Sequence, residues 1–547
     1  MDNRATEIIS TQKRLEAEDA NFRNLWQECA DLIFPRENQI ARKDEPGSEK
    51  YRDIYNATAV QDAKDMASGL SGSMIPSGQE FFAITLSSKN RGLENNDEVS
   101  RWLYEAAAIA HEKIFASNFM LQLNESLMSD IVFGTGCLFS DWSVQTGGLN
   151  YTDYDIGTYQ ICENSKGIVD TIYLKNYMTA RQAVQEFGSN CGPLVWKAAQ
   201  KPETSEKKFL YIHCVRPRKK RNQWLHDKLN MPFESIFVSV EDKLIVEEGG
   251  FKEFPFAVSR WTKSSCEKWG RGQGTAAIPA VRQLQQMERD LTECGNKHNN
   301  PPLEVLESFE GRVRVTPGAI NRVAQLNSIR AISEGSLGNY QTSREDILRK
   351  EEEIHRIFFR DIFVQMGQLQ GDRRTAEEIR ARINEGLRRL GMPVMRLQSE
   401  KFTPTLTRSI LLLIRNGDIP YPPKELEGAG FGIEYRGEIA LALRDNQARG
   451  FINFAQLVGN LEGLLPGSID NINADRAIPR MAKSFGVNIN DIATEEERDE
   501  KRRIRAEKQQ QVEQMQAAQV AAEGYNKTKD DAGENSPAGM LMQGAGA

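Results

Sequence analysis

Apolar side chains recur every three or four residues over much of the first 132 positions, which is the period of an amphipathic helix. The pattern predicts helices over 4–33, 56–70 and 99–132, the last of them broken near Ser117. A short apolar run at 81–86 is typical of a strand. The N-terminal part is therefore expected to be mainly helical.

The period changes to two after residue 136, as expected for strands with one buried face. Six strands are predicted, at 137–142, 159–162, 167–174, 209–215, 233–240 and 243–248. A short helix at 180–187 interrupts them. This middle third is predicted to be an α+β domain with a mostly antiparallel sheet.

A helical period returns at residue 275. It predicts a helix over 275–297 that Pro301 stops, and a second over 343–364 with Ser343 as its N-cap. The segment between them is predicted to form a β unit, with strands at 303–309 and 312–316 joined by a turn at Glu310.

Residues 365–374 are polar and contain two glycines, which predicts a loop. A capping box at Thr375 begins a long helix that is expected to be interrupted at 391–393 and to end near 415. Shorter helices are predicted at 438–460 and 474–484.

A second capping box, at Thr494, begins a polar helix that is acidic first and basic later, an order that the helix dipole favours. The last residues, 524–547, show no pattern and are expected to be disordered.

Composition narrows the function classes. The chain has 547 residues, 39% of them hydrophobic, so it can bury a sizeable core. Its net charge of −7 argues against tight non-specific DNA binding by the whole surface. The longest strongly apolar run, Ile410–Ile414, is far below the roughly 18 residues that cross a bilayer, and the N-terminus lacks the apolar core of a signal peptide. A soluble protein without a membrane partner is expected.

Cysteine and histidine spacing gives no sign of a cofactor. The seven cysteines include no CxxC pair, which favours free thiols in a reducing cytoplasm. The five histidines show no HExxH spacing, so no metal site is predicted. No spacing indicates a Ser-His-Asp or Cys-His arrangement, and we expect no catalytic residue.

Four local motifs leave alternatives open. The glycines of 270–274 precede a helix and could cradle phosphate, although a flexible joint is the simpler interpretation. Asp153 and Asp155 would share a strand face and could hold Mg²⁺ in a nuclease, or be solvated. The basic run 216–221 could contact nucleic acid or be a solvated loop, and Arg373 and Arg374 could present cations from their loop.

Several short stretches, in this order along the chain, resemble the head-to-tail connector (portal) family of short-tailed phages. They are Tyr51–Val60 with Met66–Leu70, Pro76 and Phe81-Phe82; Ser117–Phe119 through Phe133–Leu138; Trp269–Gly272; Arg374–Ile379; and Phe402–Pro404 through Ile419-Pro420. The resemblance covers roughly residues 50–490, with Arg374–Ile379 as the sharpest match.

The resemblance implies an α+β portal fold with an α/β wing, a two-helix stem, a small β clip and a helical crown. The implied parts are a wing at 1–277, a first stem helix at 278–300, a clip at 301–342, a second stem helix at 343–364, a tunnel loop at 365–374, a long kinked wing helix with C-terminal helices at 375–490, a crown helix at 491–523 and a tail at 524–547.

It also implies where DNA and partner proteins would be contacted. The expected tunnel-loop residues are Gln365, Gln368, Gln370, Asp372, Arg373 and Arg374. The expected stem-lining residues are Arg344, Lys350, Glu351 and Glu352, and the expected docking residues of the clip are Glu304, Glu307, Glu310, Arg312 and Arg314.

The function implied is a ring, expected to be a dodecamer, at one capsid vertex of the virion, assembled in the host cytoplasm. Double-stranded DNA would pass through it during packaging and ejection. The implied partners are terminase, a tail adaptor, the major capsid and scaffolding proteins, and internal core proteins. Two alternatives remain: a Mg²⁺-dependent nuclease, and a monomeric adaptor that binds nucleic acid.

Overall fold

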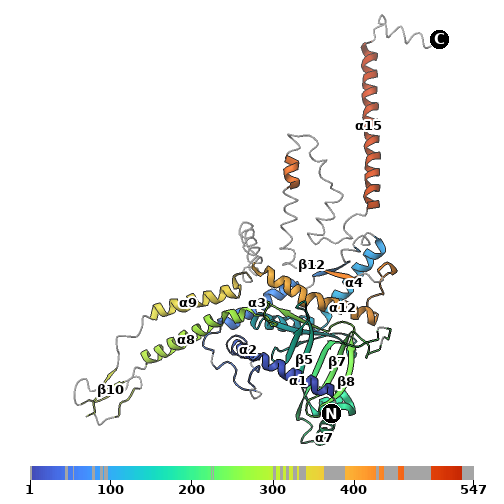
Figure 1. The fold of residues 1–547 in the computed structure, drawn as a ribbon. Helices are drawn as coiled ribbons and strands as arrows, with labels where there is room; N and C mark the ends of the chain where they lie inside the picture. The colour runs from blue at the N-terminus through green and yellow to red at the C-terminus, as the bar shows by residue number, and fades with distance from the viewer. Residues whose placement is uncertain are drawn as a thin grey trace, which may run out of the picture. The chain divides into compact units, whose positions relative to one another are not determined.

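The computed structural model divides into two compact units, Met1–Leu443 and Arg444–Ala547, which are described separately (Figure 1). The residues that it describes are 3–37, 39–42, 47–52, 54–76, 80–86, 90, 96–222, 224–225, 227–299, 303–307, 312–315, 320–323, 329–331, 340–362, 389–426, 430–436, 454–460 and 495–531.

The first predicted helix is in fact two, α1 (Asn3–Glu18) and α2 (Ala20–Leu32), which meet at Asp19. Asp19 is buried and its carboxylate pairs with Lys268 at 2.9 Å, so the break is held by a long-range ion pair. It lets α1 lie against the large sheet while α2 packs elsewhere. Periodicity could not find this break, because both helices keep the same spacing.

The next helices agree with the pattern in outline. α3 (Thr58–Met74) runs further than predicted, through the Ser-Gly-Ser sequence, where the Ser73 hydroxyl donates to the Gly69 carbonyl. α4 (Asp97–Ala116) and α5 (Phe119–Val132) confirm the predicted break. The predicted strand at 81–86 is β1 (Phe82–Leu86), and it pairs antiparallel with the distant β12 (Phe431–Tyr435).

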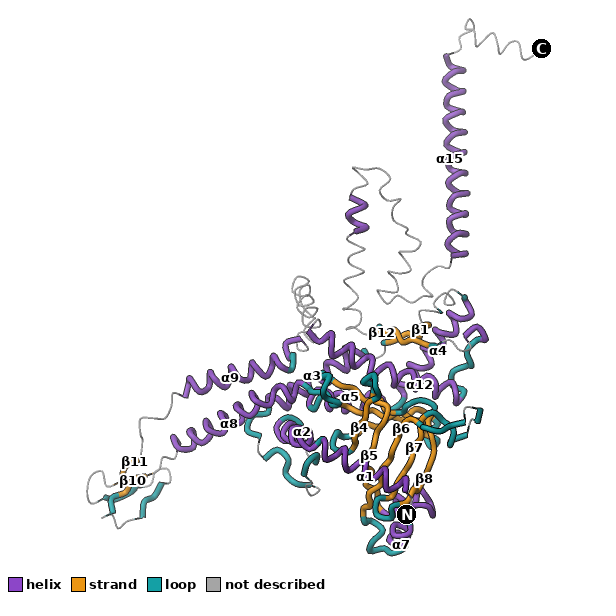
Figure 2. The backbone as a smooth tube through the Cα atoms, in the orientation of Figure 1, coloured by secondary structure: helices purple, strands orange, loops and turns teal. Residues whose placement is uncertain are grey.

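Two antiparallel sheets follow (Figure 2). One has the order β3-β2-β9, from β2 (Thr135–Ser143), β3 (Gly148–Tyr154) and β9 (Phe256–Arg260). The other has the order β4-β5-β6-β7-β8, from β4 (Tyr159–Glu163), β5 (Val169–Thr179), β6 (Lys208–Pro217), β7 (Phe233–Ser239) and β8 (Leu244–Phe251). All six predicted strands are confirmed, and α6 (Ala180–Phe187) is where the short helix was expected. The prediction missed β3, β9 and the short helix α7 (Pro193–Ala199).

α8 (Gln273–Asn299) and α9 (Tyr340–Ile357) run side by side, and a two-stranded sheet lies at their far end (Figure 1). That sheet pairs β10 (Leu303–Val305) with β11 (Ile329–Ala331). The predicted strand at 312–316 was wrong, since residues 312–315 form no strand. The docking residues Arg312 and Arg314 therefore do not share a strand face.

The predicted second helix of this pair was also misplaced. α9 begins at Tyr340, so Ser343 lies inside the helix and is not its N-cap. It ends at Ile357 and not at 364, because Phe359 takes a left-handed backbone with φ of 54° that an α-helix cannot accommodate.

The long C-terminal helix of the first unit is described from residue 389. Gly391-Met-Pro393 does not interrupt it, contrary to expectation, because residues 389–397 are helical. The irregularity lies later, in a π-helical stretch at Gln398–Phe402 that continues into α12 (Thr403–Asn416). The capping box predicted at Thr375 lies outside the described residues.

One apolar core joins these elements, drawn from α2 to α5, β2, α8, α9 and α12. At its centre the Trp26 and Trp269 rings meet edge to face, with centroids 4.8 Å apart. Smaller clusters lie between α1 and the large sheet, and between α6, α7 and that sheet.

In the second unit, α15 (Glu495–Asp531) extends eight residues beyond the predicted end of the crown helix at 523, into the segment expected to be disordered. Residues 454–460, within the predicted helix 438–460, are helical. The helix predicted at 474–484 lies outside the described residues.

Candidate functional site

The paired helices α8 and α9 are held together by apolar side chains at three- and four-residue spacing. Ile278, Val281 and Leu284 are buried on α8, and Ile347 and Ile354 on α9. Such spacing is typical of helices that pack along their length. The faces turned away from this stripe are free to carry charge.

The base of the pair is bound by a polar network to the segment that directly precedes α3. The Gln285 side-chain oxygen accepts from the backbone N–H groups of Tyr55 and Asn56, at 2.7 and 2.9 Å. The Asn56 side chain donates to both Glu288 and Glu351, so it joins α8 to α9. The pair therefore has a fixed orientation where it leaves the core.

A second contact fixes the end of α9. His355 Nδ1 lies 2.5 Å from a carboxylate oxygen of the buried Asp62 on α3, and Arg360 donates to His355 Nε2 at 2.7 Å. Burial raises the pKa of Asp62, although His355 and Arg360 oppose that effect. The contact lies at the helix break produced by Phe359.

The four expected stem-lining residues lie on α9, in different surroundings. Arg344 is exposed, and Glu352 pairs with Arg356 one turn away. Lys350 pairs with Glu353 at 2.8 Å. Glu351 is engaged by Asn56 and is the least available of the four. Three of the four thus keep mixed charge at the surface of the helix.

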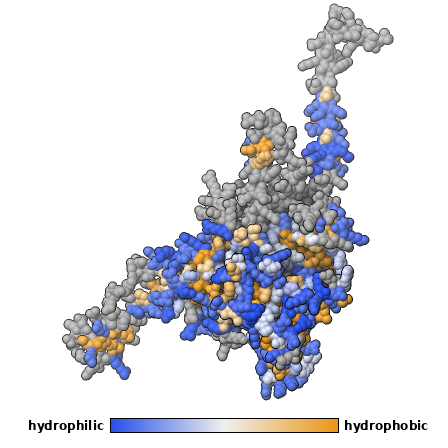
Figure 3. Space-filling view, in the orientation of Figure 1, coloured by the Kyte–Doolittle hydropathy of each residue, from blue (hydrophilic) through white to orange (hydrophobic). Residues whose placement is uncertain are grey.

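The tip of the pair exposes both charge and apolar surface. Glu304, Glu307, Arg312 and Arg314 are exposed, and Glu310 lies outside the described residues. The Asn321 side chain bonds both the N–H and the C=O of Arg314 at 2.8 Å, and so replaces a strand partner. Five exposed apolar residues also lie here (Figure 3): Val305, Leu306, Val315, Ile320 and Val323.

All six expected tunnel-loop residues, Gln365, Gln368, Gln370, Asp372, Arg373 and Arg374, lie outside the described residues. Their role stays a prediction.

The glycines of 270–274 act as a joint. A Cβ at Gly270 would overlap the Gly134 carbonyl, and one at Gly272 would overlap the Ile131 carbonyl. Gly274 approaches Val132 in the same way. These residues let the start of α8 contact the end of α5 backbone to backbone, which favours the joint over a phosphate cradle.

A fully buried ion pair that the sequence analysis missed joins α5 to the π-helical stretch. Lys401 Nζ donates to Asp130 and, at 2.6 Å, to Ser126, and both charged side chains have no exposed surface. Ser259 donates to the same Asp130 carboxylate at 2.7 Å. Burial raises the pKa of Asp130 while Lys401 opposes that effect.

The neighbouring Arg260 is also almost fully buried. It forms a two-pronged pair with Glu400, at 3.0 and 2.7 Å, and a further pair with Glu163. Glu400 and Lys401 both belong to the π-helical stretch, where Lys401 is fully buried and Glu400 is partly exposed. Sequence spacing could not predict these ion pairs, because the paired residues are more than 90 positions apart.

The nuclease alternative depended on Asp153 and Asp155. Burial raises the pKa of Asp153 to about 7, and one of its carboxylate oxygens has no hydrogen-bond partner. β3 ends at Tyr154, so Asp155 lies beyond the strand. Within the described residues no group of three His, Cys, Asp or Glu side chains could hold a metal ion. The geometry offers this alternative no support there.

The basic run 216–221 divides in two. Arg216 pairs with Glu234 at 2.5 Å, and Arg218 pairs with Glu248 at 3.2 Å. Lys219, Lys220 and Arg221 are exposed and form no ion pair in the described part of the chain. The run is thus partly structural.

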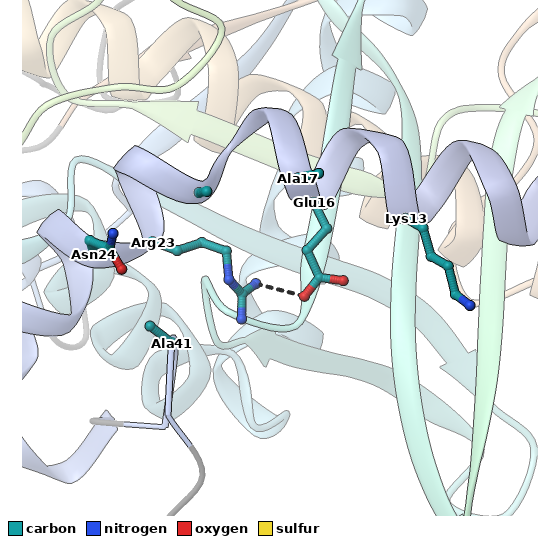
Figure 4. Close-up of a pocket in the computed structure, with 7 residues that line it drawn as sticks. Lys13, Glu16, Ala17, Arg23, Asn24 and Ala41 are labelled. Atoms are coloured by element: carbon teal, nitrogen blue, oxygen red, sulfur yellow. Dashed lines mark ion pairs between the residues drawn. The ribbon is translucent and has the colours of Figure 1, made fainter.

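Two hollows of the described surface are open to solvent. Figure 4 shows one of about 380 Å³ at the junction of α1 and α2, where Arg23 pairs with Glu16 at 3.4 Å. Lys175 reaches the same carboxylate at 2.5 Å. Burial raises the pKa of Glu16, but the Lys175 and Arg23 contacts outweigh it and lower that pKa. One carboxylate is thus paired with two cations.

Other sequence expectations concern cysteines and membranes. All seven cysteines are free thiols, as predicted, and only Cys266 is exposed. Among the described helices, none is both long and apolar enough to cross a bilayer.

Comparison with known proteins identifies the family. The family model described as "Bacteriophage head to tail connecting protein" matches residues 5–492. The chain is similar to the portal protein of Salmonella phage epsilon15, with 25% identity over 99% of this chain and 98% of that protein. It is also similar to the probable portal protein of Bordetella phage BPP-1, with 24% identity over 94% and 92%. The family match, which spans both the sheets and the α8–α9 pair, shows that this chain belongs to the bacteriophage head to tail connecting proteins, structural components of the virion.

Proposed function

We propose that this chain is the subunit of a portal ring at one capsid vertex, through which double-stranded DNA enters and leaves the head. The observation that carries the proposal is the family match over a chain that also contains a rigidly based helix pair with an exposed tip. The relatives from epsilon15 and BPP-1, named portal protein and probable portal protein, support it.

In this proposal α8 and α9 form the stem. The 27 residues of α8 span about 40 Å, enough for the wall of a channel. The packed stripe between the helices and the contacts to α3 keep that wall stiff. The residues before α8 form the wing, and α15 forms the crown.

A ring of identical copies needs a contact between two different surfaces of each subunit. Three exposed apolar residues on helical segments, Leu348, Met392 and Met395, are suited to it. Burial against a neighbour would remove their surface from water. We assign the subunit contact to these positions.

The wall should let DNA slide. Each phosphate that a cation neutralises strengthens binding, so a wall dense in unpaired Lys and Arg would slow the DNA. The pairing of Lys350 and Arg356 with carboxylates of their own helix fits low friction. The loop 365–374, with Arg373 and Arg374, is proposed as the constriction that holds the packaged genome.

The tip of the helix pair is proposed as the clip. Its exposed apolar residues, flanked by Glu304, Glu307 and Arg314, suit a surface that binds protein partners in turn. These partners would be terminase and later the tail adaptor. The proposal gives the chain no enzymatic role, since the terminase ATPase would supply the energy.

The direct test of the constriction is the double variant Arg373→Ala, Arg374→Ala in an infectious clone. Rings and heads should form, while the fraction of heads that keep their genome should fall at least several-fold. A matched control is Arg14→Ala, Arg101→Ala, on exposed positions of α1 and α4 outside the stem. Genome retention equal to wild type in the loop variant would refute this assignment without touching the ring itself.

A further inference from the structure

The loop between β6 and β7 presents three consecutive cations that the rest of the fold leaves unused. Lys219, Lys220 and Arg221 are all exposed, and none forms an ion pair within the described residues. The whole chain carries a net charge of −7, so this is a local reversal of sign. Neither the stem nor the clip includes this loop.

The base of the loop is held in place from both sides. Arg218 pairs with Glu248 at 3.2 Å and donates to the carbonyls of Gly249, at 2.7 Å, and Met231, at 3.3 Å. Its own backbone N–H donates to the Pro232 carbonyl at 2.8 Å. The cations that follow therefore leave the sheet from an anchored point.

A tryptophan stands on the same loop. Trp224 is 90% exposed, against 37% for Trp196 on α7. Its backbone N–H donates to the Asn222 side chain, and the Asn222 backbone N–H donates to Asn230 across the loop, at 2.9 Å. Local hydrogen bonds thus hold the backbone of Trp224 on the same loop as the three cations.

We propose that this loop is a second contact site for duplex DNA, outside the channel, which binds the phosphate backbone without sequence preference. Three adjacent cations match the charge of successive phosphates. The indole N–H of Trp224 can donate a hydrogen bond to a phosphate oxygen, and the indole ring can pack against a deoxyribose. Arg216 and Arg218 take no part, because the sheet already uses them. A contact here would hold DNA that lies against the wing.

An acidic protein surface would be the other polyanion able to meet these cations. The two partners differ in their response to salt. Neutralising three phosphates of B-DNA contributes about −2.7 to the slope of log K against log salt concentration, because condensed counterions are released. A carboxylate surface has no such condensed layer and gives a much shallower dependence.

The test compares two triple variants of the full chain. Lys219→Gln, Lys220→Gln, Arg221→Gln removes the loop cations. Lys201→Gln, Lys207→Gln, Lys208→Gln removes three exposed lysines at the opposite end of β6 and changes the net charge equally. Binding to a fluorescent 20-base-pair duplex is measured by anisotropy from about 50 to 200 mM salt, and binding to polyglutamate is measured in parallel.

The loop variant should lose at least tenfold in duplex affinity at low salt. Its slope of log K against log salt concentration should become shallower by about 2.7 for each loop that contacts the duplex. The control variant should match wild type in both measurements. Equal losses in both variants, or an unchanged slope in the loop variant, would overturn the proposal. Loss of polyglutamate binding alone would also overturn it, in favour of an acidic protein. Ring images of each variant keep this outcome separate from the proposed portal function.

Discussion

Charged side chains have opposite environments in two regions of the molecule, the one around the two larger sheets and the one at the tip of the α8–α9 pair. Near the sheets, charged side chains are buried and paired across long sequence distances, as Lys401 is with Asp130 and Arg260 with Glu400. At the tip, Glu304 and Arg314 are exposed beside apolar residues that are also exposed. The first arrangement fixes a fold, and the second leaves a surface for other molecules to cover.

The comparison gives each region its own expected sensitivity. Breaking a buried pair leaves one charge without a partner in a dry interior, which costs several kcal/mol. Changing an exposed residue usually costs less than about 0.5 kcal/mol of stability. Substitutions near the sheets should therefore unfold the chain, while substitutions at the tip should affect only its partners.

The largest effect is expected for Lys401→Met. It leaves Asp130 buried and unpaired, so the free energy of unfolding should fall by about 3–5 kcal/mol in urea denaturation. The double variant Asp130→Asn, Lys401→Met removes both charges and should recover most of the loss. If the single variant is as stable as wild type, the pair does not fix the contact between α5 and the π-helical stretch.

The next largest effect is expected at the glycine joint. Gly272→Ala would push a Cβ into the Ile131 carbonyl and should cost about 2–4 kcal/mol. Gly295→Ala lies within α8, with no atom within 4 Å of the added Cβ, and should stabilise by about 0.5–1 kcal/mol. Thermal denaturation of the two variants separates backbone contact from helix propensity. Equal melting temperatures for the two variants would contradict the close backbone contact at Gly272.

A pH-dependent effect is expected for Asp153→Asn. The pKa of Asp153 rises from 3.8 to about 7 on folding, so the folded state holds the proton more tightly. Its stability is thus greatest at low pH and is lost as pH rises through 7. Relative to wild type, the variant should gain up to about 4 kcal/mol between pH 4 and pH 8. A difference between variant and wild type that stays constant over this range would show that the carboxyl is not buried.

The smallest effect on stability is expected at the tip. Val315→Glu with Ile320→Glu should change the melting temperature by no more than about 2 °C, because both side chains are already exposed. Binding of purified terminase to the rings, measured by co-sedimentation, should fall at least tenfold. If terminase binding is undiminished, the docking surface does not lie at the tip.

The sequence predicted those parts that follow from local periodicity. Alternation located the six strands, and three- to four-residue spacing located α8 and the stripe that packs against α9. β9 was missed because all five of its residues are buried, so its sequence does not alternate. The pairing of β10 with β11 was missed because the stretch 312–316 is closer to β10 in the sequence and was therefore predicted to be its hairpin partner.

The long-range polar contacts could not have been predicted from one sequence. Asp130 and Lys401 are 271 positions apart, and nothing in either neighbourhood indicates the other. The break at Asp19 depends on Lys268 in the same way. Lys219, Lys220 and Arg221 were easier to identify as candidate DNA contacts, because they are adjacent in the sequence. Only the structure distinguishes them from Arg216 and Arg218, which form ion pairs with residues of the sheet.

The account depends on identical copies surrounding an open axis. Negative-stain images of the purified full-length chain, averaged with rotational symmetry, test this most directly. We predict closed rings with a central hole in wild type, and their loss in Leu348→Glu with Met395→Glu, while the variant keeps its melting temperature. A chain that remains monomeric at every concentration, and is absent from infectious particles as an oligomer, would contradict the account.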